Sequence, residues 1–191
     1  TDFNIAGKKG LAIAEKPNLQ KIVKDVFDRH AAEIPYSLDF VAQRGHLLSL
    51  LKPQEVNESF KQWSWDNLPI TSKSLGGWHY EVTQEVKQGN FLTSQERYDA
   101  IEKAIHSGKY DFIVHIGDPD REGQLLIDLV LEKIGNQLPV YRYWENALTD
   151  VKVLSALKNL KPNDSEFFQN ILKAGKARQH ADYLFGMNLS R

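Results

Sequence analysis

Residues 112–124 read FIVHIGDPDREGQ, and this stretch decides the fold. An apolar run of strand length, residues 112–116, is followed by a glycine and then by three carboxylates, Asp118, Asp120 and Glu122. A second glycine opens a segment in which apolar residues recur at helical spacing. The pattern predicts a buried strand that turns directly into a helix, with the acidic residues gathered at the turn.

The three carboxylates have two interpretations. Acidic residues are common in the first turn of a helix, where they cap free N–H groups and complement the helix dipole. Three carboxylates within five residues also repel one another, and a cation among them removes that repulsion. Hard oxygen ligands favour Mg²⁺ over zinc, and hence chemistry on phosphates. We favour the metal site and keep the helix cap as the alternative.

A second segment carries chemistry at the end of a short apolar run. Residues 10–14, GLAIA, lead into Glu15, Lys16 and a proline, after which apolar residues again recur at helical spacing. In parallel sheets, ligands collect at the carboxyl ends of the strands. If the two strands are neighbours, Glu15 joins the acidic residues at one site and Lys16 stands beside them as a cation. The alternative is an ordinary turn.

The rest of the chain alternates between strand and helix patterns. Strands are predicted over 38–43, 47–51, 80–86 and 139–144, and helices over 94–106, 123–134, from 150 onward and over 166–184. An irregular segment, 55–77, contains aromatic residues that we expect to be core anchors. This alternation predicts an α/β fold, a mostly parallel sheet with helices on both faces and a C-terminal helical segment.

Bulk properties set the class of protein. The chain of 191 residues fits one domain with a small appendage, and no apolar run approaches membrane-spanning length. The absence of cysteine excludes disulfides and thiolate zinc sites and is typical of a cytoplasmic protein. The net charge of −1 means that any nucleic-acid binding rests on a local patch. Residues 1–10 lack a signal-peptide pattern and are predicted to be an extension.

These segments together resemble the Toprim domain of topoisomerases, some primases and related nucleases. The similarity is closest to type IA DNA topoisomerases of the topoisomerase III branch. It rests on AIAEKP (12–17), GHLL (45–48), DPDREGQ (118–124), RYW through LT (142–149) and ARQHADYLFGMNLSR (177–191), which appear in family order. The resemblance implies a Rossmann-like Toprim domain over 11–150 and the start of a helical DNA-binding domain over 151–191.

The resemblance also implies roles at the acidic site. Asp118 and Asp120 would hold Mg²⁺, with Glu122 nearby or bound through water. Glu15 would act as general acid toward the leaving 3′-oxygen, in contact with the metal as well. Lys16 would stabilise negative charge on the phosphoryl group.

Contacts with single-stranded DNA are implied for a further set of residues. They are His46, Arg121, Arg178, Asp182, Asn188 and Arg191. For Arg121 we favour pairing with one of the acids over DNA contact, and His46 has a structural alternative. Lys173, Lys176 and His180 form either a backbone-binding stripe or a solvated helix face. Trp63, Trp65 and Trp78 are expected to anchor the core rather than to stack on bases.

The family cleaves one DNA strand with a tyrosine, passes a strand through the break and religates it. None of the seven tyrosines of this chain lies in a context that resembles the nucleophile. We therefore expect an N-terminal fragment that does not relax DNA by itself, with DNA and the remaining domains of the same enzyme as partners. The alternatives are a free-standing Toprim nuclease or primase-like protein, and a non-enzymatic Toprim-like module that binds DNA or a partner.

Overall fold

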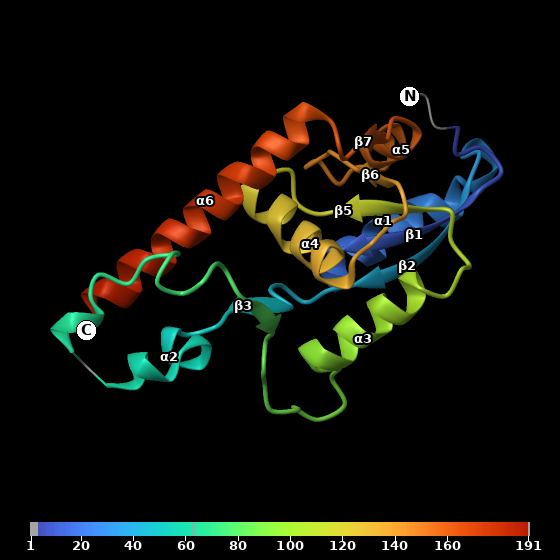
Figure 1. Ribbon diagram of the computed structural model, residues 1–191. Helices are drawn as coiled ribbons and strands as arrows, with labels where there is room; N and C mark the ends of the chain where they lie inside the picture. The colour runs from blue at the N-terminus through green and yellow to red at the C-terminus, as the bar shows by residue number, and fades with distance from the viewer. Residues whose placement is uncertain (1–3, 63, 191) are drawn as a thin grey trace.

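A computed structural model describes residues 4–62 and 64–190. Its centre is a five-stranded sheet with the strand order β2-β1-β5-β6-β7 (Figure 1). The strands are β1 (Lys9–Ala14), β2 (Ser37–Ala42), β5 (Phe112–Ile116), β6 (Val140–Arg142) and β7 (Lys161–Pro162). The first four run parallel and β7 is antiparallel to β6, so the predicted mostly parallel sheet is confirmed.

Helices and a small second sheet complete the fold. The helices are α1 (Pro17–Arg29), α2 (Pro53–Val56), α3 (Ser94–Ile105), α4 (Arg121–Ile134), α5 (Asp150–Lys158) and α6 (Glu166–Leu189). Short 3₁₀ turns cover Ala31–Glu33, Glu58–Lys61 and Trp65–Asn67. The strands β3 (Leu48–Leu50) and β4 (Tyr80–Val82) pair antiparallel beside the main sheet.

Helices cover both faces of the central sheet, as predicted (Figure 1). One face of β1 presents Leu11 and Ile13 to a core shared with α3, α4 and the first half of α6. The other face presents Ala12 and Ala14 to a core shared with α1 and α5. Because both faces are buried, β1 and β5 consist almost entirely of apolar residues rather than alternating ones.

The pairing of β1 with β5 positions the site. In this parallel pair Ala14 lies opposite Ile116. Both strands therefore end at the same level, and the segments after them, beginning at Glu15 and Gly117, leave the same edge of the sheet. The adjacency on which the sequence argument depended is confirmed.

The irregular segment packs against the end of α6. Phe60, Ile70 and Leu75 form a separate small core with Leu184 and Met187. This packing keeps α6 helical to Leu189, five residues beyond the predicted end. Helix length here is decided by a tertiary contact rather than by local sequence.

The tryptophans only partly follow the prediction. Trp65 is 88% exposed, so its assignment as a core anchor is wrong. Trp78 is half-buried and packs against α6 rather than in the core: its ring stacks on that of His180, with centroids 3.8 Å apart. Trp63 lies outside the described residues. No helix in the described part of the chain is long and apolar enough to cross a membrane.

Candidate functional site

A backbone-to-carboxylate hydrogen bond joins the two chemical segments. The amide N–H of Asp118 donates to Oε2 of Glu15 at 2.9 Å, and the amide of Glu15 donates to the carbonyl of Ile116, also at 2.9 Å. Glu15 is only 5% exposed. The predicted partners Glu15 and Asp118 are therefore brought together, and the glutamate is held firmly under the acidic loop.

Lys16 places a positive charge between these two carboxylates. Its Nζ lies 2.6 Å from Oδ2 of Asp118 and 3.4 Å from Oε1 of Glu15. The hydrogen bond to Asp118 is the main cause that raises the pKa of Lys16, and the charge of Glu15 adds to it. The ammonium thus remains protonated at neutral pH and balances the two acids.

Asp120 caps helix α4. Its Oδ1 accepts a hydrogen bond from the amide of Gly123 at 2.7 Å, which is the N-cap arrangement. A Cβ atom on Gly123 would lie 2.3 Å from the carbonyl oxygen of Asp118 and 2.5 Å from its amide nitrogen. Only glycine permits this approach, as predicted for the close contact at the helix start.

The GHLL segment reaches the acidic motif from β2. Gly45 adopts a φ of +71°, and its amide donates to the carbonyl of Glu15 at 3.3 Å. The next residue, His46, places Nε2 2.7 Å from Oε1 of Glu122. Both side chains are about half exposed, so this pair borders solvent at the edge of the site.

The carboxylates do not form a ready coordination shell. Among residues 4–62 and 64–190, no group of three or more histidine or acidic side chains is arranged to hold a metal ion. Each acid has another partner instead: Asp118 pairs with Lys16, Asp120 accepts from the amide of Gly123, and Glu122 pairs with His46. The donors nevertheless fit Mg²⁺ in kind, because they are carboxylate oxygens at one sheet edge whose charge already attracts a cation.

An open cavity of about 430 Å³ lies beside these residues. Lys16, Asp118 and Asp120 form one part of its wall, and Glu145 and Asn146 form another. A ligand that enters here meets the ammonium and the carboxylates together.

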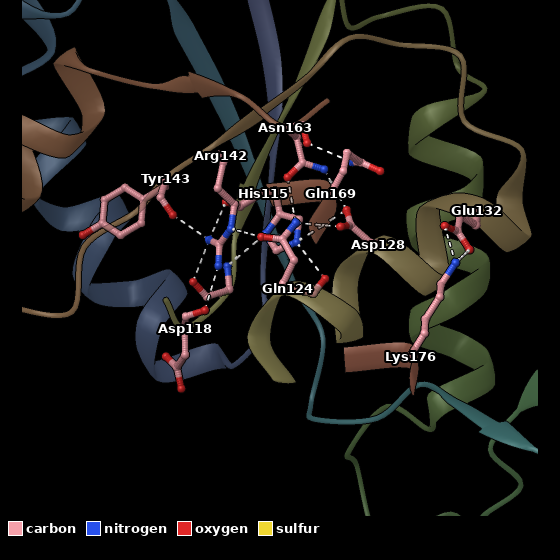
Figure 2. A network of polar contacts seen from close by, with 11 residues as sticks. His115, Asp118, Gln124, Asp128, Glu132, Arg142, Tyr143, Asn163, Gln169 and Lys176 are labelled. Carbon is pink, nitrogen blue, oxygen red and sulfur yellow. Dashed lines mark hydrogen bonds and ion pairs between the residues drawn. The ribbon is translucent and has the colours of Figure 1, made fainter. Parts of the chain in front are cut away.

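Arg142 holds the backbone of the acidic loop, a role that the sequence did not indicate (Figure 2). It is fully buried at the end of β6. Its Nη1 donates to the carbonyls of His115 at 3.2 Å and Gly117 at 2.8 Å, and its Nη2 donates to that of Asp118 at 2.7 Å. One side chain therefore fixes the backbone of three residues at and before the first acid.

A buried network continues from Arg142 toward α6 (Figure 2). Arg142 Nε donates to Oε1 of Gln124 at 2.9 Å, and Nε2 of Gln124 donates to Asp128 at 2.6 Å. Asn163 donates to the other Asp128 oxygen at 2.9 Å. Burial lowers the pKa of Arg142 to about 10, which leaves it protonated at neutral pH, and burial raises the pKa of Asp128.

His115 belongs to the same network as a neutral side chain. Its Nδ1 accepts from the amide of Gly117 at 3.3 Å, and its Nε2 contacts the carbonyl of Gln124 at 3.2 Å. Burial is the main cause that holds its pKa well below the usual value, and the charge of Arg142 adds to it. The 3.7 Å separation from Asp128 is therefore not an ion pair. Nδ1 is the acceptor and Nε2–H the donor.

The residues predicted to contact DNA on α6 have partners within the chain. Arg178 and Asp182 pair with each other at 3.6 Å on the exposed face. The side chain of Asn188 bonds to both backbone groups of Ile70, at 2.7 and 3.0 Å. DNA contact by these three stays a prediction. Arg191 lies outside the described residues.

Two residues of the possible basic stripe also have partners within the chain. Lys176 pairs with Glu132 at 2.7 Å, and His180 stacks on Trp78, so backbone contact by the stripe stays a prediction. One expectation needs correction. The pairing of Arg121 with an acid is not formed in the described part of the chain. Arg121 is exposed there, beside the acidic motif.

Comparison with known proteins agrees with the fold and the motifs. The chain belongs to the Toprim domain family, whose model matches residues 10–163. Among curated proteins, it is 27% identical over 187 residues to DNA topoisomerase 3 of Staphylococcus epidermidis, and 26% identical over 193 residues to that of Staphylococcus aureus strain N315. Each alignment covers 96% of this chain, which spans about a quarter of each relative's length. The resemblance to topoisomerase III is confirmed.

A solved structure also resembles the chain. Full-length topoisomerase I from Thermotoga maritima matches with a TM-score of 0.56 and 17% sequence identity, over 91% of this chain and 24% of that one. At this identity the match supports the Toprim fold alone.

Proposed function

We propose that this chain supplies the metal-binding Toprim part of a type IA DNA topoisomerase of the topoisomerase III kind. The observation that carries the proposal is the junction of β1 and β5. There the Asp118 amide bonds to Glu15, and both carboxylates share the ammonium of Lys16. This arrangement places two carboxylates, for proton transfer and metal binding, beside an ammonium at one edge of the sheet, as phosphoryl transfer requires.

The proposed metal is Mg²⁺, with Asp118 and Asp120 as ligands and Glu122 and Glu15 beside them. When bound, the ion supplies positive charge that orients a DNA phosphate and the 3′-hydroxyl for religation. Glu15 donates a proton to the leaving 3′-oxygen and accepts it in the return reaction. Lys16 stabilises the negative charge that develops on the phosphoryl group.

The proposed function also needs a nucleophile and a DNA strand that this chain does not supply. The tyrosine nucleophile comes from another part of a longer protein, because none of the seven tyrosines here resembles it. The partners are a single-stranded DNA segment near the cleavage site and the remaining domains of the same enzyme. From 151 onward, α5 and β7 pack into the central α/β fold and α6 begins the helical DNA-binding domain. The protein acts in the cytoplasm.

The test compares DNA cleavage with DNA binding in the complete protein. Lys16→Met should lower cleavage of a single-stranded oligonucleotide with little loss of affinity, because the ammonium acts on the transition state. Equal loss of both would refute the assigned role.

A nuclease assay separates the closest alternative. The 191-residue chain incubated with Mg²⁺ and single-stranded DNA should show no turnover. Metal-dependent degradation that is abolished by Asp118→Asn would instead favour a free-standing Toprim nuclease.

A further inference from the structure

An aromatic side chain and a cation form an exposed pair close to the acidic edge. The guanidinium carbon of Arg44 lies 5.1 Å from the centre of the Phe91 ring. Phe91 is 63% exposed, so its ring face is open to a ligand. Within residues 4–62 and 64–190, the Arg44 guanidinium has no hydrogen bond or ion pair. Its charge and its donors are therefore available to a ligand.

The pair borders an open cavity of about 460 Å³. The cavity lies between Arg44 and the segment 85–93, which connects β4 to α3, and its wall includes the exposed side chains Val86 and Leu92. The other charged side chains of the wall are engaged: Lys87 pairs with Glu96 at 2.5 Å, and Glu85 accepts hydrogen bonds from the amide and the hydroxyl of Ser94. Arg44 is thus the cation of this wall that lacks an anionic partner in the described chain.

The position of Arg44 ties this cavity to the candidate site. The next residue, Gly45, bonds to the backbone of Glu15, and the one after it, His46, pairs with Glu122. A single DNA strand that reaches the acidic edge past His46 would continue onto Arg44 and Phe91.

We propose that Arg44 and Phe91 form a subsite for one unpaired nucleotide of a single-stranded DNA that reaches the acidic edge. The proposal rests on the DNA-cleaving function proposed above. An unpaired base presents a flat face that stacks on aromatic rings and on arginine planes, whereas a base inside a duplex does not. The unpaired charge of Arg44 suits the adjoining phosphate.

The test measures affinity and its salt dependence separately. A fluorescein-labelled oligothymidylate of about ten nucleotides is titrated with the 191-residue chain at several NaCl concentrations and followed by anisotropy. Phe91→Leu should weaken binding about fivefold without changing the salt dependence, because it removes stacking but no charge. Arg44→Gln should reduce the slope of log K against log salt by about 0.7, the value for one phosphate contact on a single strand.

Matched variants control for general effects. Phe167→Leu removes another exposed aromatic, 58% exposed at the start of α6, and Lys109→Gln removes an exposed charge at the opposite edge of the sheet. Both should bind as the unmodified chain does. Phe91→Tyr keeps the ring and should restore affinity, whereas Arg44→Lys keeps the charge and should restore the salt slope.

The outcomes distinguish this subsite from the proposed function. If the unmodified chain binds and the variants at 44 and 91 match it in affinity and slope, the subsite is refuted. The cleavage and metal tests, which involve neither residue, are unaffected by that result. If the unmodified chain binds no single-stranded DNA at low salt, the subsite is refuted together with DNA contact by this chain.

Discussion

The Nζ of Lys16 lies 2.6 Å from Oδ2 of Asp118, where the proposed function requires a divalent cation. The same ammonium lies 3.4 Å from Glu15. A side chain of the protein thus provides the charge balance that Mg²⁺ would provide. Because both cations are attracted to the same carboxylate, we expect metal binding to compete with Lys16 for Asp118, which would release the ammonium to a DNA phosphate.

Removing Lys16 should therefore tighten metal binding while it impairs catalysis. Two unit charges about 4 Å apart interact by about 1 kcal/mol in a water-like environment, so an ammonium acting on a divalent ion is worth about 2 kcal/mol, or roughly thirtyfold in affinity. We expect Lys16→Met to lower the Kd for Mn²⁺ by about this factor, measured by electron paramagnetic resonance of free Mn²⁺. Lys24→Met, which removes an exposed lysine of α1 that pairs with Asp28, is the control. Weaker Mn²⁺ binding in Lys16→Met would contradict the competition.

Two substitutions at Asp120 separate its role as a helix cap from its proposed role as a ligand. Asparagine caps a helix as well as aspartate does, whereas alanine costs about 1 kcal/mol. Asp120→Asn should leave the free energy of unfolding nearly unchanged and weaken metal binding, whereas Asp120→Ala should lower both. Urea denaturation and Mn²⁺ titration of the two variants give the comparison. If Asp120→Asn leaves the metal affinity unchanged, capping helix α4 is the only role of Asp120.

Arg142 should be among the residues most sensitive to substitution. Arg142→Met leaves the carbonyls of Gly117 and Asp118 without their donor and Asp128 without its nearby charge. Removing one partner from a buried charged network costs about 3–5 kcal/mol. We expect a loss of about that size in urea denaturation, together with weaker metal binding. A variant as stable as the unmodified chain would show that the network does not support the loop.

The buried His115 predicts a pH dependence of stability. Its folded pKa lies below the unfolded value of 6.5, so the unfolded chain binds more protons as the pH falls. Stability should therefore decline as the pH falls below about 6.5. The raised pKa of Asp128 acts in the opposite direction, at pH values above the unfolded value of 3.8.

His115→Gln isolates the histidine contribution. The unmodified chain and this variant differ in unfolding free energy, and this difference should shrink as the pH is lowered from about 7.5 toward about 5.5. This range extends about one unit on either side of the unfolded histidine pKa of about 6.5. A difference that stays constant over this range would mean that His115 has the same pKa in the folded and the unfolded chain, and a difference that grows would mean that His115 is protonated in the folded state.

The sequence was sufficient to predict the main elements and the meeting of Glu15 with Asp118. Both follow from local signals: apolar runs of strand length, helical spacing, and the rule that parallel strands end at one edge. The start of α4 was placed two residues late, at Gly123, because its cap is the acidic residue that we assigned to metal.

The buried network was not predicted because its members are scattered along the chain. Arg142 meets Gln124 and Asp128 only after β5, α4 and β6 have packed together. One signal was present: Gln124 and Asp128 are polar residues four apart on a helix that is otherwise apolar on that face. The contact of Lys16 with Asp118, at the proposed metal position, depends on side-chain distances that sequence spacing does not give.

The most direct test of the central claim is a crystal structure of the chain with Mn²⁺, whose anomalous scattering locates the ion. The account predicts a peak at about 2.1–2.2 Å from carboxylate oxygens of Asp118 and Asp120, with Lys16 moved away from Asp118. An absence of density there at high Mn²⁺ concentration, with both aspartates ordered and Lys16 still between Glu15 and Asp118, would contradict it.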